Sequence, residues 1–231
     1  MSLHLVRVPV RPPQLLRFAT VHGITQEEDG LGYTLHAWLA ALFAEAAPKP
    51  FRYFERRQEV LAYARYEAEE LRQRAQTFAD PVAWAALQPD GLLSKPMPAE
   101  WRTGRRLNIE VLTCPVSRKD SEEKDIFLRA LDRLGAAAPS RGETYRQWFL
   151  RQWDGAVQFE RLDLLGIEAR ARLLRRARNG SSRLRVIERP QALFRGRAII
   201  QDANRFATVL ARGIGRHRAF GFGMVLLSPP R

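Results

Sequence analysis

The first half of the chain alternates short apolar runs with two stretches of helical periodicity. In residues 33–47, apolar side chains recur at the spacing of one helix face: Leu35, Trp38, Leu39, Leu42 and Ala46. A charged segment, 67–78, has a weaker repeat of the same kind. Short runs typical of strands lie at 3–10, 51–54, 59–64 and 107–112. The resulting β-α-β-β-α-β order predicts a ferredoxin-like unit.

The second half predicts a more irregular arrangement. We interpret the charge run 118–124, which lacks apolar residues, as a linker that separates a domain of residues 1–118 from a second domain of residues 125–231. Helices are expected at 126–134, 144–153 and 202–211, the last with Asp202 near its N-cap. Strands are expected at 156–162, 184–188, 192–200 (with a turn at Gly196) and 224–227. The arginine-rich residues 168–179 fit either a helix or an extended segment.

Charge narrows the choice of partner. The 231 residues carry a formal net charge of +13, while 45% of them are hydrophobic, which is enough for a core. Such a charge opposes compaction unless a polyanion relieves it, so nucleic acid is the first expectation and an acidic membrane surface the second. A basic protein without a special partner is the remaining alternative.

Cysteine and histidine usage argues against disulfides and metals. The single cysteine, Cys114, excludes an internal disulfide, and four scattered histidines make a structural zinc site unexpected. We therefore expect no metal or other cofactor. Residues 1–10 lack the features of a signal peptide, and no apolar run is long enough to span a bilayer. The expected location is the cytoplasm, with no membrane partner.

A glycine-rich segment near the C-terminus is the most informative motif. Two Gly-x-Gly pairs, Gly213/Gly215 and Gly221/Gly223, flank Arg216, His217 and Arg218 ahead of an apolar strand. Glycine lets the backbone turn with positive φ and approach a ligand closely, and arginines add forked donors. This combination suits a phosphate backbone. A glycine-rich hairpin or helix exit with solvated arginines is the alternative interpretation.

Tyr33 and His36 are the candidate catalytic pair. On a helix they lie about one step apart, away from the centre of the apolar stripe. Both side chains should therefore leave the core and share a surface. Histidine titrates near neutral pH and can donate or accept a proton. The alternative is an exposed aromatic residue and histidine at a helix start.

Several segments together resemble one known family. These are Val186–Gln191, Phe194 with Gly196-Arg197, the helix that leads into Gly213-Ile214-Gly215, and the strand 111–116. The chain resembles the CRISPR repeat-processing endoribonucleases of the CasE (Cse-type, subtype I-E) group. Cys114 stands where that group usually has Asn.

The resemblance implies an α+β fold of two tandem ferredoxin-like (RRM-like) domains. It also implies metal-independent cleavage of the repeat hairpin of CRISPR precursor RNA, 3′ of the stem, leaving 5′-OH and 2′,3′-cyclic phosphate ends. The enzyme would stay on the mature guide RNA as a subunit of the type I-E surveillance complex. The competing hypothesis from another class is a non-catalytic subunit that binds the RNA hairpin.

The resemblance also bears on individual residues. Tyr33-Thr34-Leu35-His36 matches the family's Tyr-x-x-His, although the sequence leaves open which residue is base and which is acid. Arg197 corresponds to a basic residue near the scissile phosphate and is the expected transition-state clamp; Arg195 lies beside it. His22 could reach the same cleft, His217 is expected to contact phosphate, and His4 is expected to be structural or solvated.

Further RNA contacts are expected from two basic segments. Arg118, Lys119 and Lys124 fall where the family has a basic hairpin that enters the RNA groove, although here Asp120, Glu122 and Glu123 are mixed among them. A second cluster consists of Arg170, Arg172, Arg175, Arg176 and Arg178, for which a solvated helix face is the alternative. Hairpin RNA is gripped mainly through shape and backbone, so arginines suit this purpose.

Overall fold

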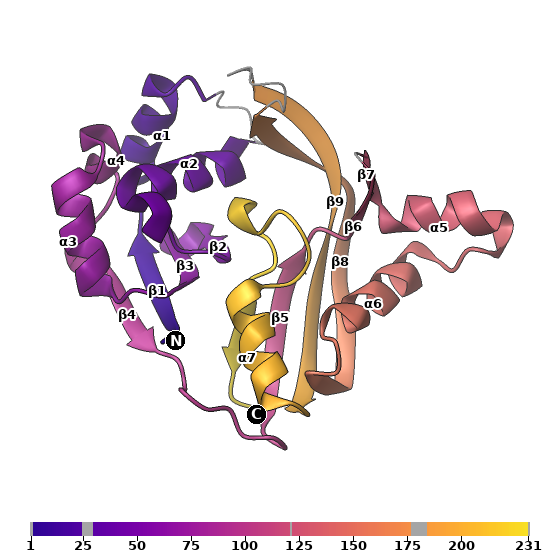
Figure 1. Cartoon of the computed structure of the whole chain (residues 1–231). Coiled ribbons are helices and arrows are strands. Elements are labelled where there is room, and N and C mark those ends of the chain that lie inside the picture. Colours follow the sequence, from indigo (N-terminus) through magenta and orange to yellow (C-terminus); the bar gives the residue numbers. More distant parts are fainter. Residues whose placement is uncertain (1, 25–29, 121, 177–183, 231) are drawn as a thin grey trace. The chain divides into compact units, whose positions relative to one another are not determined.

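Two four-stranded antiparallel sheets organise the chain, with the orders β2-β3-β1-β4 and β10-β5-β9-β8 (Figure 1). The computed structural model describes residues 2–24, 30–120, 122–176 and 184–230, and for 170–176 and 184–185 it describes the backbone alone. The chain divides into two units. The first comprises Met1–Ala99, Arg172–Ile187 and Ala219–Gly221, and the second comprises Glu100–Ala171, Glu188–Arg218 and Phe222–Arg231.

The first unit contains the elements of the first sheet and its helices. In chain order they are β1 (His4–Pro9), α1 (Pro12–Val21), α2 (Leu31–Phe43), η2 (Ala44–Ala46), β2 (Phe51–Phe54), η3 (Glu55–Arg57), β3 (Glu59–Ala64), α3 (Ala68–Phe78), α4 (Pro81–Ala85), η4 (Pro89–Gly91) and β4 (Leu93–Pro96). Strand β1 is central and pairs antiparallel with both β3 and β4.

The sequence predicted β1, β2, β3, α2 and α3 but missed α1. Pro12 is the first residue of this helix and Pro13 the second. Proline is well suited to the first helical turn, because the N–H group that it lacks would have no helical partner there. Strand β4 was missed as well, because its four residues have no clear apolar alternation.

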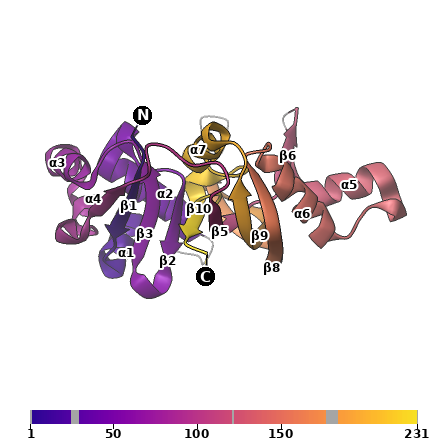
Figure 2. The ribbon, with the colours of Figure 1, turned by 90° about the horizontal axis from the view of Figure 1, so that it is seen from below.

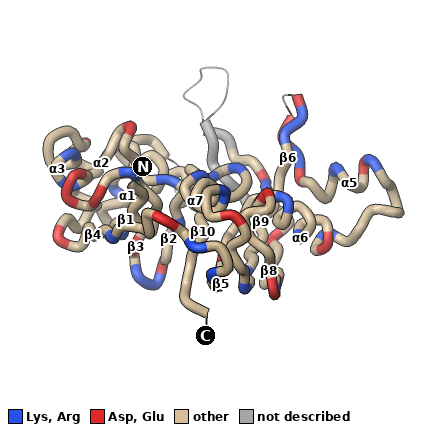
Figure 3. The backbone as a smooth tube through the Cα atoms, turned by 60° about the horizontal axis from the view of Figure 1, so that its bottom comes forward, with Lys and Arg blue, Asp and Glu red and all other residues tan. Residues whose placement is uncertain are grey.

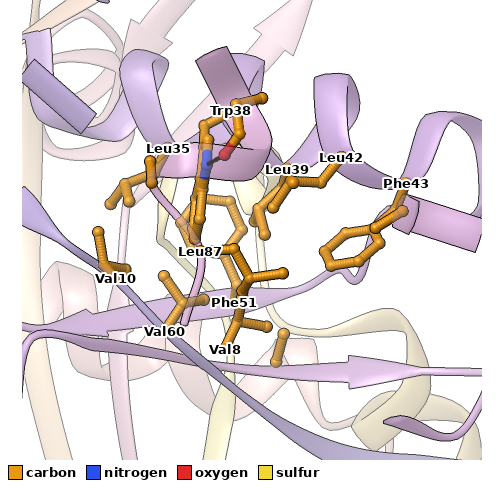
Figure 4. Close-up of a cluster of buried hydrophobic side chains, with 14 of the residues drawn as sticks. Val8, Val10, Leu35, Trp38, Leu39, Leu42, Phe43, Phe51, Val60 and Leu87 are labelled. Atoms are coloured by element: carbon orange, nitrogen blue, oxygen red, sulfur yellow. Dashed lines mark hydrogen bonds between the residues drawn. The ribbon is translucent and has the colours of Figure 1, made fainter. Parts of the chain in front are cut away.

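The expected apolar stripe of α2 forms the core of the first unit (Figure 4). Leu35, Trp38, Leu39 and Leu42 are all buried among residues of the sheet and the other helices. The Trp38 indole Nε1 donates a hydrogen bond of 2.9 Å to the carbonyl oxygen of Ala83, so its polar atom is satisfied inside the core. Burying this face fixes the rotation of α2 and therefore the direction of its remaining side chains.

The second unit contains the other strands and helices, with α6 beside β8 and α5 beyond it (Figure 2). Its elements are β5 (Arg106–Thr113), β6 (Val116–Lys119), β7 (Glu122–Asp125), α5 (Ile126–Leu134), η5 (Gly135–Ala137), α6 (Arg141–Gln152), β8 (Val157–Arg176), β9 (Leu184–Ile200), α7 (Ala203–Arg212), η6 (Arg218–Phe220) and β10 (Val225–Ser228). Of these, Arg172–Arg176 of β8, Leu184–Ile187 of β9 and Ala219–Phe220 of η6 are grouped with the first unit. Asp202 caps α7 as expected, accepting a hydrogen bond of 2.9 Å from the Arg205 N–H.

Strand β5 belongs to the second sheet, so its expected place as the last strand of the first unit is wrong. It pairs antiparallel with β9 on one side and with β10 on the other. Strand β4 takes the position at the end of the first sheet instead. The division between the units accordingly precedes β5, ahead of the boundary that we expected near residues 118–125.

Two further local expectations are wrong. The charge run 118–124 forms a hairpin, because β6 and β7 pair from Val116 with Asp125 to Lys119 with Glu122. The turn expected at Gly196 does not exist, since β9 continues through it. A Cβ at Gly196 would lie 2.6 Å from the carbonyl oxygen of Arg161, so glycine there permits a close approach of neighbouring backbone.

Both sheets have the ferredoxin-like strand order. Numbered within its own unit, each sheet runs 4-1-3-2, and the helices follow the first and third strands. The fold is therefore α+β with two tandem ferredoxin-like domains, as expected.

Candidate functional site

Tyr33 and His36 both lie on α2, on the side of the helix that is not occupied by its buried apolar stripe. Both side chains are half-buried, and their ring centroids are 6.4 Å apart in an edge-to-face arrangement. Tyr33 also packs against the core cluster. The predicted pair therefore shares a surface, but that surface is more enclosed than expected.

A third ring, Phe220, completes this group. Its centroid lies 6.3 Å from that of Tyr33 with the planes nearly parallel, and 5.3 Å from that of His36 with the planes steeply inclined. Phe220 belongs to Ala219–Gly221, the part of the glycine-rich segment that is grouped with the first unit. No pattern in the sequence had singled out Phe220.

The environment of His36 favours the neutral imidazole. Burial lowers the pKa of His36 below its ordinary value of 6.5, and the positive charge of Lys49 lowers it further. A neutral imidazole can accept a proton at neutral pH. Lys49, itself exposed, also places a cation close enough to act on His36. No motif had pointed to Lys49.

In the second unit, Arg216 and His217 of the glycine-rich segment contact a buried carboxylate, Glu123 of β7, whereas Arg218 donates to the carbonyl oxygen of Arg212. Arg216 Nε lies 2.6 Å from Glu123 Oε2, and His217 Nε2 lies 2.6 Å from Glu123 Oε1. Arg189 of β9 adds a contact of 2.9 Å to Oε1. The Glu123 side chain is 7% exposed and that of His217 5%, so little of the imidazole remains for a phosphate.

The pKa of Glu123 reflects these contacts. Burial alone would raise it, but hydrogen bonds and charge from His217, Arg189 and Arg216 outweigh burial and hold the pKa of Glu123 far below its usual range. Glu123 is therefore ionised at neutral pH and ties β7 to both β9 and the glycine-rich segment. In the sequence, Glu123 is only one of three acidic residues mixed among the basic residues of 118–124.

The β6–β7 hairpin carries the other expected RNA contacts (Figure 3). Arg118 and Lys119 are exposed on β6, and the Arg118 Nε donates to the carbonyl oxygen of Asp120 at 3.2 Å. Lys124 forms an ion pair with Asp132 of α5. Arg118 and Lys119 are thus better placed for a ligand than Lys124.

Arg195 and Arg197 lie in the middle of β9, both exposed on one side of the strand. Arg195 Nη2 is 2.6 Å from Glu110 Oε2, and these two residues are direct partners in the register of β5 and β9. Arg197 is opposite Asn108. Because the two residues lie within a continuous strand, they do not flank a turn as expected.

The four glycines of the segment have positive φ, between 74° at Gly215 and 91° at Gly221. At Gly223, with φ of 75°, a Cβ would also overlap the carbonyl oxygen of Ile214. The Gly223 N–H donates 2.7 Å to the carbonyl oxygen of Leu112 in β5, and its own carbonyl accepts from the Ile214 N–H at 2.8 Å. Glycine is required here to bring the segment back to the sheet.

The remaining candidates take structural positions. His22 follows α1, packs against Phe18 with ring centroids 4.3 Å apart, and lies 3.4 Å from Asp80 Oδ2. Cys114 is fully buried, which raises the pKa of its thiol. In the described part of the chain, His, Cys, Asp and Glu side chains do not gather in a group that could hold a metal ion.

The side chains of the second basic cluster lie outside the described residues. The structure does not describe the side chains of Arg170, Arg172, Arg175 and Arg176 or any part of Arg178, so this cluster stays an expectation. Within the described ranges, the helices are all too short or too polar to cross a bilayer.

Comparison with known proteins gives one family and a set of similar folds. The family model described as "CRISPR associated protein" matches residues 3–229. No curated protein matches the chain.

Three solved structures illustrate the likeness. A CRISPR endoribonuclease Cse3 bound to a 19-nucleotide RNA has a TM-score of 0.65 and 17% identity, with 99% of this chain and 98% of that chain covered. Cas6e from Escherichia coli has a TM-score of 0.57 and 16% identity, with 100% of both chains covered. A chain of a CRISPR RNA-guided surveillance complex has a TM-score of 0.59 and 17% identity, also with 100% of both covered.

Proposed function

The chain belongs to the CRISPR associated protein family, and on this premise we propose that it is an endoribonuclease that processes CRISPR precursor RNA. The single observation that carries the proposal is the edge-to-face contact between Tyr33 and His36, which are half-buried on the side of α2 that its buried stripe does not occupy. Supporting observations are the net charge of +13 and a fold like that of Cse3 bound to RNA.

The proposed reaction uses the RNA's own 2′-OH and needs no metal ion. His36, neutral at pH 7, accepts the 2′ proton while Tyr33 orients the hydroxyl group. The 2′-oxygen then attacks the adjacent phosphorus and the bond to the 5′-oxygen breaks. The leaving oxygen takes up a proton, so the products carry a 2′,3′-cyclic phosphate and a 5′-OH.

Positive charge would stabilise the dianionic transition state. We assign this role to Arg197, as the resemblance implies, and note Lys49 as a second cation that acts on His36. The substrate would be the repeat hairpin, cut 3′ of its stem. We assign its backbone contacts to Arg118, Lys119, Arg195, Arg216 and Arg218, with His217 holding the glycine-rich segment in place.

The proposed partner after cleavage is the mature guide RNA, and the protein would remain on it as a subunit of a type I-E surveillance complex. The likeness to a chain of a CRISPR RNA-guided surveillance complex supports this assignment. An intracellular, cytoplasmic location follows from the proposed substrate.

Cleavage of the cognate repeat RNA in EDTA tests the proposal. We expect His36→Ala to slow cleavage by about 10²–10⁴-fold, because a proton-transfer group is lost, while hairpin affinity stays within a few-fold of wild type. His22→Ala is the matched control and should cleave normally.

A repeat with a 2′-deoxy nucleotide before the cut should bind and remain intact. Cleavage of that substrate would contradict the 2′-OH mechanism. Tight binding without any cleavage of the normal repeat by the wild-type protein would instead establish a non-catalytic RNA-binding subunit.

A further inference from the structure

Phe220 contacts both members of the candidate catalytic pair. Its ring is nearly parallel to that of Tyr33, with 15° between the planes, and inclined by 64° to that of His36. Tyr33 and His36 also contact each other edge to face. Each ring in this group of three therefore restricts the other two.

The backbone at Phe220 is held against the start of α2. Gly32 is the second residue of that helix, and a Cβ at this position would lie 2.8 Å from the Phe220 carbonyl oxygen. Only glycine leaves room for so close an approach without a shift. On the following residue, a Cβ at Gly221 would meet the Phe51 ring at 3.6 Å, an ordinary packing distance. The position of the Phe220 ring is thus set by its main chain as well as by its side chain.

We propose that Phe220 is a positioning residue, which fixes the orientation of the His36 imidazole and shields one side of it from water. The proposal rests on the proposed function of His36 and adds a role for the glycine-rich segment other than phosphate binding. Phe220 itself has no group that could transfer a proton.

The physical basis is ring packing and desolvation. Edge-to-face ring pairs are favourable beyond the area that they bury, so the contacts with Phe220 and Tyr33 favour one imidazole orientation. Exclusion of water disfavours the charged form of an imidazole, in agreement with the lowered pKa of His36, for which burial is the largest cause. Among the described residues, the neighbouring groups identified for His36 also include the Tyr33 ring, on the same helix, and the charge of Lys49, which follows η2.

The first test measures the His36 pKa in the free, full-length protein by NMR titration of its four histidines. Phe220→Ala opens the shielded side, so we expect the His36 pKa to rise toward 6.5. Phe220→Leu keeps the bulk but not the ring, and an intermediate value is expected. Phe78→Ala, which removes an exposed phenyl ring of α3, is the matched control and should leave the His36 pKa unchanged. An unchanged His36 pKa in both Phe220 variants would overturn the proposal.

The second test separates orientation from binding. Misplacement of a reacting group by about 1 Å can cost up to 10²-fold, so Phe220→Leu should lower kcat by about tenfold or more with KM nearly unchanged. Phe220→Tyr, which restores a ring, should recover most of the rate. A fall in affinity with an unchanged kcat would show that Phe220 contacts RNA and would refute the positioning role.

The outcomes distinguish this inference from the function on which it rests. If the His36 pKa shifts in Phe220→Ala while His36→Ala cleaves normally, the catalytic role of His36 is refuted, but the packing of Phe220 on His36 is confirmed. If His36→Ala is inactive while the His36 pKa does not change in either Phe220 variant, only the positioning role of Phe220 is refuted.

Discussion

In the first unit the candidate groups are half-buried rings, and the pKa of His36 is lowered because burial away from water and the nearby cation Lys49 disfavour its charged form. In the second unit the candidate groups are basic side chains, and two of them, Arg216 and His217, contact the buried carboxylate of Glu123. The strand order is the same in both units. Units of the same topology can therefore shift the pKa of a buried group by different means. Burial shifts the pKa of His36 in the first unit, and ion pairs shift the pKa of Glu123 in the second.

Removal of Glu123 should produce the largest change, and it should act through stability. Glu123→Ala leaves Arg189, Arg216 and His217 without their shared acceptor, and breaking a buried ion pair in this way typically costs about 3–5 kcal/mol. Urea unfolding at pH 7 measures the loss. Glu110→Ala is the control: its partner Arg195 is 60% exposed, so removing this surface pair should cost at most about 1 kcal/mol. Equal losses of unfolding free energy in the two variants would show that Glu123 contributes no more to stability than a surface ion pair.

Lowering the pH should reduce the contribution that Glu123 makes to stability. The folded-state pKa of Glu123 is depressed, so its contribution to stability is complete above the ordinary value of 4.5 and is lost as pH falls below that value. Between pH 7 and pH 3 the wild-type unfolding midpoint should therefore fall more than that of Glu123→Gln, which cannot titrate at this position. Parallel pH profiles of the two proteins would contradict the ionised state inferred for Glu123.

Two glycines at equivalent helix positions, one in each unit, should differ in how much stability an alanine substitution costs. Gly32 is the second residue of α2 and Gly142 the second of α6. A methyl group at Gly32 would collide with the Phe220 backbone, whereas one at Gly142 would meet Leu164 at 3.6 Å. Gly32→Ala should cost about 1–3 kcal/mol, and Gly142→Ala should be neutral or stabilise by up to about 1 kcal/mol. Thermal unfolding measures both, and a neutral Gly32→Ala would refute the close contact.

The smallest expected effect concerns the salt dependence of RNA binding. Arg118 and Lys119 are exposed, so Arg118→Ala with Lys119→Ala should reduce the log–log slope of affinity against salt by up to about two units. Arg216→Ala should reduce it by less than one unit, because Glu123 already neutralises part of that charge. Binding isotherms over a range of salt concentrations test this order, and a larger change for Arg216 would reverse our ranking of the two surfaces.

Local pattern was sufficient to predict much of the fold. Strands β2 and β3 and helix α5 have the predicted bounds, because each is a short periodic run with a clear stop on either side. The apolar stripe of α2 also predicted that Tyr33 and His36 share a side of the helix, since burial of one helix face determines the direction of the others, but both are half-buried and Tyr33 packs against the core.

Other missed features depend on contacts between distant parts of the chain. Nothing in the alternation of β5 indicates which sheet it joins, since a strand of that pattern would fit either one. Glu123 looks like any charge in a mixed run until the fold brings Arg189 and Arg216 to it from 66 and 93 residues away. Phe220 was missed for the same reason, because its partners on α2 are remote in sequence.

The pairing of β5 with β10 has a consequence for the order of events during translation. All four strands of the first sheet have been synthesised by Pro96, whereas β5 must wait for β9, which begins at Leu184, and then for β10, which begins at Val225. Until then Leu107, Ile109 and Val111 have no sheet in which to be buried, and both edges of their strand lack hydrogen-bond partners. A nascent chain on the ribosome can thus complete its first sheet early, while the unpaired strand of the second sheet is open to aggregation until the last strand emerges.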